Sequence, residues 1–213
     1  MPQEIRRLTL TAGLFMLIAC RGGIGDGEGG GETDPFLAEL GYRTGLDSAP
    51  VTVVEFSDFG CPYCAQFALT SYPDLHAKFV LSGEVRWNYV PFVLGIFPNS
   101  EAATRAAECA AEQNRFWQMH DHLYQRQMDW RTSADPSALL LELALLAGVD
   151  EATFEVCYHQ EDDEIAERID RQNRLAEGAR VRATPTFFVN GQMVEGALPA
   201  AQFGALLERA LGR

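Results

Sequence analysis

Residues 51–64 read VTVVEFSDFGCPYC, and this stretch decides how the chain folds. Its first residues, Val51 to Phe56, are β-branched or aromatic except for Glu55, a composition typical of a buried strand. Beyond the second cysteine, apolar residues recur at roughly helical spacing: Phe67, Ala68, Leu75 and Phe79. The sequence therefore predicts a strand that passes directly into a helix, with Cys61 and Cys64 at the junction.

The position of Cys61 favours a reactive thiol. Pro62 suits the first helical position, because its missing N–H would have no partner there. Cys61 then lies beside unpaired backbone N–H groups and the positive end of the helix dipole. Both stabilise the thiolate, which is the reactive form of cysteine. Cys64 follows one turn later on the same face, within reach of a disulfide. We predict a dithiol–disulfide redox site.

Three other uses of this cysteine pair stay open. A zinc site needs further ligands, but the other cysteines are isolated, and His120 and His122 would point in different directions on a helix. A purely structural disulfide would close a very short loop and add little stability. A Cu(I) carrier would combine the thiols with a nearby methionine or histidine, and Met119 and His120 lie far off in the sequence.

The N-terminus predicts export. Arg6 and Arg7 precede an apolar stretch ending at Ala19, which is too short to span a bilayer but suits the core of a signal peptide. We therefore expect residues 1–19 to be a signal peptide. Ala19 directly before Cys20 resembles the cleavage site of bacterial lipoproteins, which implies a lipid on the Cys20 sulfur. An ordinary secretory signal with an incidental cysteine is the alternative.

A lipid-anchored flexible linker is expected over residues 20–47. Glycine dominates residues 21–31, and such a composition cannot pack a core. Only a short helix around Phe36, Leu37 and Leu40 is expected before the folded domain begins. Either type of signal would bring the protein to an oxidising compartment outside the cytoplasm, where disulfides persist.

Cys109 and Cys157 remain after the other cysteines are assigned. Both lie in segments of helical composition. Because two unassigned thiols in an oxidising compartment tend to pair, we predict a structural Cys109–Cys157 disulfide that joins two helices. Two separate buried cysteines that pack as small apolar side chains are the alternative.

The composition limits the classes of partner. The chain has 213 residues, 47% of them hydrophobic, and a formal net charge of −13. Residues 48–213 have the length of one domain and can bury a full core. The acidity argues against binding to nucleic acid and to anionic lipid headgroups.

The order of elements predicts an α/β core interrupted by helices. Strands are expected at 51–57, 84–91, 185–189 and 192–195, the last two joined by the turn signal Asn190-Gly191. Helices are expected at 62–80 (kinked at Pro73), 99–113, 115–128, 136–147, 151–158, 161–178 and 200–211. The chain thus opens β-α-β, continues through an all-helical insertion at about 98–178, and ends β-β-α.

Three segments in this order resemble the DsbA-like thiol–disulfide oxidoreductases of the thioredoxin superfamily. They are VVEFSDFGCPYC at 53–64, AECAAEQNRFWQMH at 107–120 and ATPTFFVNG at 183–191. The four-residue motif alone is also the glutaredoxin signature, but the exported N-terminus and the long insertion disfavour that family. The resemblance implies a thioredoxin-like fold, a central mixed sheet flanked by helices, with the helical insertion between its βαβ and ββα halves.

The resemblance also implies roles for individual residues. Cys61 would be the exposed nucleophile and Cys64 the less exposed resolving thiol, while Pro62 and Tyr63 would tune the stability of the thiolate. Glu55 matches the family's buried acidic position and could relay a proton to or from Cys64. A strand glutamate at a solvent-facing end is the alternative for Glu55.

A second implied element is the family's cis-proline. Pro185 would pack against the active-site disulfide, and its cis bond would expose the backbone of Thr184 for pairing with a client peptide. An ordinary trans bond is the alternative. Thr184 leaves the direction of electron flow open, because the resemblance associates a threonine here more often with isomerases or reductases than with oxidases.

The expected function is that of an exported enzyme, a protein-disulfide oxidoreductase, and the leading expectation is a dithiol oxidase. A disulfide reductase or isomerase is the alternative, although no dimerisation module is visible and a monomer is expected. The cysteine pair itself carries the reaction, so no metal or organic cofactor is expected. The expected partners are exported proteins with reduced or mispaired cysteines, a membrane redox partner and, through lipidated Cys20, the membrane itself.

Overall fold

The computed structural model describes residues 40–160 and 164–213. The predicted signal peptide, Cys20, Phe36 and Leu37 lie outside the described residues. The strands are β1 Tyr42–Thr44, β2 Val51–Ser57, β3 Val85–Pro91, β4 Thr186–Val189 and β5 Gln192–Glu195. The helical segments are α1 Pro62–Gln66, η2 Phe67–Ser71, α2 Tyr72–Leu75, η3 His76–Val80, α3 Ser100–Glu112, α4 Phe116–Gln125, α5 Gln127–Arg131, α6 Ser137–Ala147, α7 Glu151–Tyr158, α8 Glu164–Gly178 and α9 Ala200–Ala210.

The strands form one mixed sheet in the order β1-β3-β2-β4-β5. The central pair, β2 and β3, is parallel, and the other pairs are antiparallel. A parallel pair needs a crossover, which the helical segment from α1 to η3 supplies. This mixed sheet confirms the predicted α/β class, with the helical insertion between its two halves.

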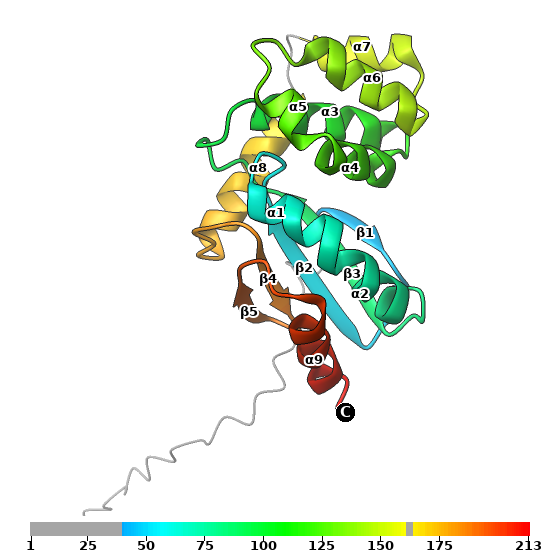
Figure 1. The fold of residues 1–213 in the computed structure, drawn as a ribbon, viewed down its shortest axis with the longest axis vertical. Coiled ribbons are helices and arrows are strands. Elements are labelled where there is room, and N and C mark those ends of the chain that lie inside the picture. Colours follow the sequence, from blue (N-terminus) through cyan, green and yellow to red (C-terminus); the bar gives the residue numbers. More distant parts are fainter. Residues whose placement is uncertain (1–39, 161–163) are drawn as a thin grey trace, which may run out of the picture.

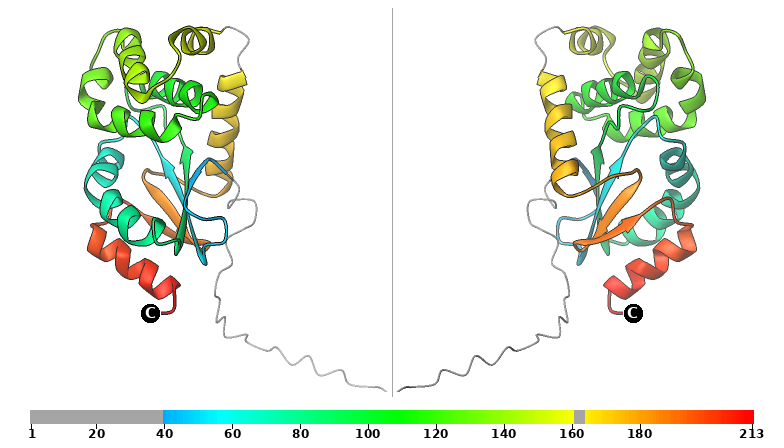
Figure 2. Two further views of the ribbon diagram at one scale, coloured as in Figure 1. Left: turned by 90° about the vertical axis from the view of Figure 1, so that its right-hand side faces the viewer. Right: turned by 90° about the vertical axis from the view of Figure 1, so that its left-hand side faces the viewer.

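Helices cover both faces of the sheet, and helices α3 to α7 of the insertion form a block beyond one end of it, while α8 returns along one face (Figures 1 and 2). On one face, Val53 and Phe187 pack with Phe67, Phe79 and other residues of the crossover helix and α9. The opposite face packs against α8, with Val54, Phe56 and Ala176 among the buried residues. Because side chains alternate along a strand, Glu55 points to the same face as Val53.

The crossover segment is helical from Pro62 to Val80, as predicted, but it is not a uniform α-helix. Two wider π-helical turns, η2 and η3, interrupt it. The first lies immediately before α2, which has Pro73 in its first turn. A proline lacks the N–H for the regular ladder, and a local change of helix type accommodates it. The predicted kink is therefore a π-helical turn.

Two boundaries differ from the sequence prediction. Tyr42–Thr44 falls within the expected linker, yet it forms β1 and pairs with β3, so the folded domain begins before residue 48. A strand this short carries too little pattern to be recognised. The expected helix 115–128 is two helices, α4 and α5, which meet at Arg126. The break allows Gln127 and Trp130 to be buried.

The C-terminal hairpin follows its turn signal. Asn190 and Gly191, between β4 and β5, have φ values of 44° and 81°. Positive φ at both central residues is what a tight hairpin turn with the right-handed twist requires. Within the two described ranges, no helix has the length and apolar character needed to cross a bilayer.

Candidate active site

The cysteine pair lies where β2 passes into the first turn of the crossover helix. Cys61 caps α1 with an extended backbone, and Pro62 occupies the first turn, as the sequence predicts. Both cysteines are free thiols in the structure. Cys61 is only 2% exposed and Cys64 is fully buried, so the residue expected to be an exposed nucleophile is almost enclosed. Tyr63 between them is 65% exposed.

The surroundings shift the pKa values of the two thiols in opposite directions. A hydrogen bond from the Cys64 thiol, with help from Thr184 and the backbone N–H groups of Cys64 and Tyr63, lowers the pKa of Cys61 to about 6. Burial, followed by the hydrogen bond and charge of Cys61, raises the pKa of Cys64 well above its ordinary value. Cys61 is therefore the group that forms a thiolate near neutral pH, and Cys64 is the one that retains its proton.

The loop before β4 lies against this pair. The Thr184–Pro185 peptide bond is cis. The Cys61 thiol donates a hydrogen bond of 3.3 Å to the Thr184 carbonyl oxygen. The Thr184 hydroxyl is buried and makes no hydrogen bond while Cys61 is a thiol, so it is free to donate to the Cys61 thiolate, and this contact lowers the pKa of Cys61. The structure thus brings Pro185, Thr184 and Cys61 together, and pairing of Thr184 with a client peptide stays a prediction.

Glu55 is buried beneath the active site, with 3% of its surface exposed, so the solvent-facing alternative is wrong. The Ser57 hydroxyl and the Trp87 indole N–H donate hydrogen bonds to its carboxylate, at 2.5 and 2.8 Å. Burial raises the pKa of Glu55, and these hydrogen bonds and the charge of His120 offset part of the rise. A raised pKa means that this carboxyl group holds its proton more tightly than an exposed glutamate does.

Asp58 is a structural residue of the site that the sequence analysis did not identify. Its carboxylate accepts hydrogen bonds from the backbone N–H groups of Gly60 and Leu94, both at 2.8 Å, and from the Ser100 hydroxyl. Burial raises the pKa of Asp58, and these donors act in the opposite direction. The contact with Gly60 is an Asx turn, which an aspartate two residues before a glycine could have indicated.

Two side chains of the helical insertion bind the backbone of the active-site loop, residues 59–61. The Gln127 side-chain amide donates to the carbonyl oxygens of Phe59, at 2.6 Å, and Cys61, at 2.9 Å. The Arg131 guanidinium donates to the Gly60 carbonyl oxygen at 3.0 Å. No local pattern points to these residues, because their partners lie far away in the sequence. The insertion therefore fixes the backbone that carries the nucleophile.

The other pair of cysteines is away from this centre. Cys109 of α3 and Cys157 of α7 are joined by a disulfide, with Cα atoms 5.8 Å apart. The pairing expected from the cysteine count is present, and it staples two helices of the insertion. Cys20, the predicted lipidation site, lies outside the described residues. Over residues 40–160 and 164–213, no group of three His, Cys, Asp or Glu side chains is placed to hold a metal ion.

Comparisons with known proteins agree with this geometry. A family model described as thioredoxin matches residues 39–209. Disulfide bond formation protein D of Bacillus subtilis (strain 168) is 28% identical over 162 residues, which cover 71% of this chain and 68% of that protein. The oxidised crystal structure of BdbD from Bacillus subtilis has a TM-score of 0.72 at 26% identity, and covers 80% of this chain and 92% of that one.

A second group of relatives is much longer than this chain. Na(+)/H(+) antiporter NhaA 3 of Salinispora tropica is 38% identical over 164 residues, which are 76% of this chain but 23% of the antiporter. The chain thus spans about a quarter of the length of such relatives. Its similarity to them lies in one part of a larger protein.

A cysteine pair at a strand–helix junction, faced by a cis-proline on a mixed sheet, defines a thioredoxin-fold thiol–disulfide oxidoreductase. The family-model match and the similarity to BdbD identify the family within this class of enzymes. The chain belongs to the DsbA-like thiol–disulfide oxidoreductases of the thioredoxin superfamily.

Proposed function

We propose that this protein donates its Cys61–Cys64 disulfide to exported proteins that carry reduced cysteines. A client thiolate attacks the Cys61 sulfur, the Cys61–Cys64 bond breaks, and Cys64 leaves and takes up a proton. A second client thiolate then attacks the client sulfur of the mixed disulfide, which releases the client disulfide and the Cys61 thiolate. The client loses two electrons, and the cysteine pair gains them.

The observation that carries this proposal is the geometry of the site: Cys61 caps α1, and its thiol is hydrogen-bonded to the Thr184 carbonyl oxygen beside the cis bond to Pro185. These surroundings lower the pKa of Cys61 to about 6. A stable thiolate stabilises the reduced form of the pair, so the oxidised form is a stronger donor of disulfides. The same value supports a second candidate, a reductase or isomerase, because it is closer to the pKa of about 7 of thioredoxin than to the roughly 3.5 of the strong oxidase DsbA.

Refolding of a reduced, unfolded disulfide protein tests the activity. The oxidised full chain should restore the client's activity and become reduced in equal amount. Cys61→Ser should abolish the reaction. Cys64→Ser, mixed with a client that already carries a disulfide, should accumulate a mixed disulfide, because the Cys61 thiolate attacks the client disulfide and no second thiol resolves the product. A Cys61→Ser variant that still catalyses refolding would reject the proposal.

Equilibration with glutathione tests the direction. A reduction potential closer to about −120 mV supports a disulfide donor, whereas one near about −270 mV favours a reductase. A membrane redox partner would reoxidise the cysteine pair of a disulfide donor, or reduce the pair of a reductase, after each reaction.

We also propose that the protein is exported and anchored through Cys20. The support is the sequence pattern at residues 1–31. Labelling of the full chain with a radioactive fatty acid in a bacterial host tests the anchor. The anchor is supported if the wild type carries the label and stays in the membrane fraction, while Cys20→Ser carries no label and is released. It is rejected if the wild type and Cys20→Ser are released equally.

A further inference from the structure

His120 is an ionisable residue enclosed by aromatic rings. Its side chain projects from α4 and is 2% exposed. Ring centroids lie 4.9 to 6.3 Å from the imidazole, and the rings belong to Phe59, Tyr72, Tyr89, Phe116, Trp117 and Tyr124. An apolar side chain would fill such a cage without any polar group to satisfy. A histidine there therefore calls for an explanation.

The imidazole contacts one carboxylate directly and lies near a second one that differs in its access to solvent. His120 Nδ1 lies 2.9 Å from Asp121 Oδ1, and the Asp121 side chain is 61% exposed. On the inner side, Tyr89 is the register partner of buried Glu55 across the parallel pair β2–β3, and its ring lies 4.9 Å from the imidazole. The charge of His120 lowers the pKa of Glu55, which agrees with this proximity.

Cys64, Tyr89 and Tyr124 belong to one cluster of buried side chains. Burial first, and then the charges of Glu55 and Cys64, raises the pKa of Tyr89. The hydroxyls of Tyr89 and Tyr124 lie 2.7 Å apart, and the ring of Tyr124 is 5.0 Å from the imidazole. The resolving thiol, the buried carboxyl and the imidazole therefore surround one pair of tyrosines.

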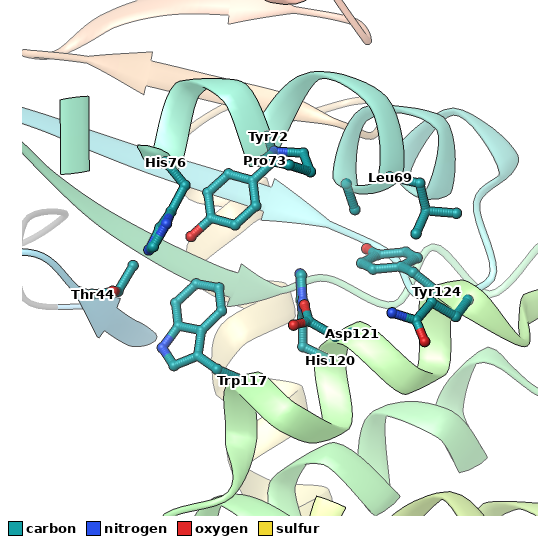
Figure 3. A pocket seen from close by; sticks show the side chains of 11 residues that line it. Thr44, Leu69, Tyr72, Pro73, His76, Trp117, His120, Asp121 and Tyr124 are labelled. Atoms are coloured by element: carbon teal, nitrogen blue, oxygen red, sulfur yellow. The ribbon is translucent and has the colours of Figure 1, made fainter. Parts of the chain in front are cut away.

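A cavity reaches His120 from the surface. It has a volume of about 590 Å³ and is bounded by the crossover helix, Thr44 and α4. Figure 3 shows His120 and Asp121 on α4 between Trp117 and Tyr124, facing Tyr72 across the cavity. Solvent in this cavity can reach Asp121 and the imidazole edge without passing the client-binding side at Cys61.

We propose that His120 carries protons between this cavity and Glu55 during disulfide exchange, which makes it a positioning residue that acts through Glu55. This inference rests on the proposed function. When the Cys61–Cys64 bond opens, the Cys64 thiolate takes a proton from the Glu55 carboxyl. The imidazolium of His120 returns a proton to Glu55 and recovers its own from solvent in the cavity. Reoxidation of the pair runs the transfers in reverse.

Imidazole suits this task because one ring nitrogen can accept a proton while the other donates one. The ionisable groups around His120 and its cavity are Glu55 of β2, Tyr89 of β3, Tyr72 of α2, His76 of η3, and Asp121 and Tyr124 of α4. The tyrosines keep their protons at neutral pH, because burial raises the pKa of each of them.

Single-turnover kinetics test the proposal with His120→Gln. The oxidised full chain is mixed with a dithiol peptide between pH 5 and 9, and formation of the reduced pair is followed. We expect a rate at least about tenfold lower than in the wild type, with a flatter pH profile. His122→Gln is the matched control: it lies on the same helix, outside the cavity lining. Its rate should equal that of the wild type.

Glu55→Gln determines whether His120 acts through Glu55. In a relay, the double variant with His120→Gln should be no slower than Glu55→Gln alone, because both changes interrupt one path. The relay would be overturned if the double variant were slowed by the product of the two single-variant factors, because the two residues would then act independently. A His120→Gln rate within twofold of the wild type, or an equal loss in His122→Gln, would also overturn it.

Chemical rescue separates a proton carrier from a residue that only fills the cage. His120→Ala opens the cage to the cavity, and added imidazole should restore a substantial part of its rate. Pyrazole, which has a similar size but is a weak base, should not. Rescue by both compounds, or by neither while thermal melting shows a folded protein, would overturn the proposal. If the wild type exchanges no disulfide, the proposed function fails instead.

Discussion

Gln127 Nε2 lies 2.9 Å from the carbonyl oxygen of Cys61, a residue 66 positions earlier in the chain. The same amide group reaches the carbonyl of Phe59 at 2.6 Å. One side chain of the insertion therefore binds the backbone on both sides of Gly60. The insertion does more than enlarge the domain, because it fixes the loop from which the nucleophile is presented.

Gln127→Ala should loosen this loop. The Phe59 and Cys61 carbonyl groups lose this donor, and because Cys61 keeps a hydrogen bond from the Ala65 N–H, the Phe59 carbonyl is the group left unsatisfied, at a cost of about 1–3 kcal/mol. We expect a free energy of unfolding lower by that order, measured with denaturant, and faster hydrogen exchange at the start of α1. Gln125→Ala is the control, because Gln125 is exposed on the preceding helix. A variant as stable as this control would show that the contact contributes nothing.

Much of the fold could be predicted because its signals are local. The apolar strand before Cys61 and the Asn190-Gly191 turn are both decided by residues adjacent in sequence. Gln127 could not be predicted, since its role depends on partners brought together by the fold. The burial of Glu55 was suggested by a family resemblance and not by the alternation of its own strand.

Thr184→Val should raise the pKa of Cys61. The Thr184 hydroxyl is one of the groups that lower this pKa to about 6, and valine keeps the shape without the hydroxyl. The alkylation rate of the reduced protein should rise with pH around a midpoint near 6 in the wild type and around a higher midpoint in the variant. Thr184→Ser is the control, because it keeps the hydroxyl. Identical midpoints in all three proteins would contradict this role.

The same pKa makes the stability of the reduced protein depend on pH. The pKa of Cys61 is lower when folded than its ordinary value of 9.0, so ionisation favours the folded state. The contribution is complete above pH 9, declines as the pH falls toward 6, and is absent below that range. Thr184→Val should reduce it.

Glu55→Gln should stabilise the protein at neutral and higher pH. Burial raises the pKa of Glu55 above its ordinary value of 4.5, so the folded state binds this proton more tightly than the unfolded state. The wild type then loses stability as the pH rises from about 4.5 through the folded pKa, whereas glutamine has no proton to lose. We expect a gain of roughly 0.5–2 kcal/mol at pH 8 and little change at pH 4, from denaturant unfolding.

Glu177→Gln is the control for this experiment, because Glu177 is exposed on α8. The gain in Glu55→Gln should be accompanied by slower disulfide exchange, since the buried proton donor is lost. A stability difference independent of pH would show that Glu55 is important for packing alone.

Replacement of both Cys109 and Cys157 by serine should weaken the insertion and spare the redox centre. Their disulfide spans 48 residues, and loss of a cross-link over such a loop costs about 2–4 kcal/mol. We expect a lower free energy of unfolding, while the alkylation midpoint of Cys61 stays near 6, because neither cysteine is among the groups that shift the pKa of Cys61. The control is a Cys61→Ser, Cys64→Ser double variant, in which the Cys109–Cys157 bond should survive. Its free energy of unfolding shows the effect of replacing two cysteines without losing that bond. A shifted alkylation midpoint of Cys61 in the Cys109→Ser, Cys157→Ser variant would mean that this disulfide also determines the position of α5, whose Gln127 binds the backbone of Cys61.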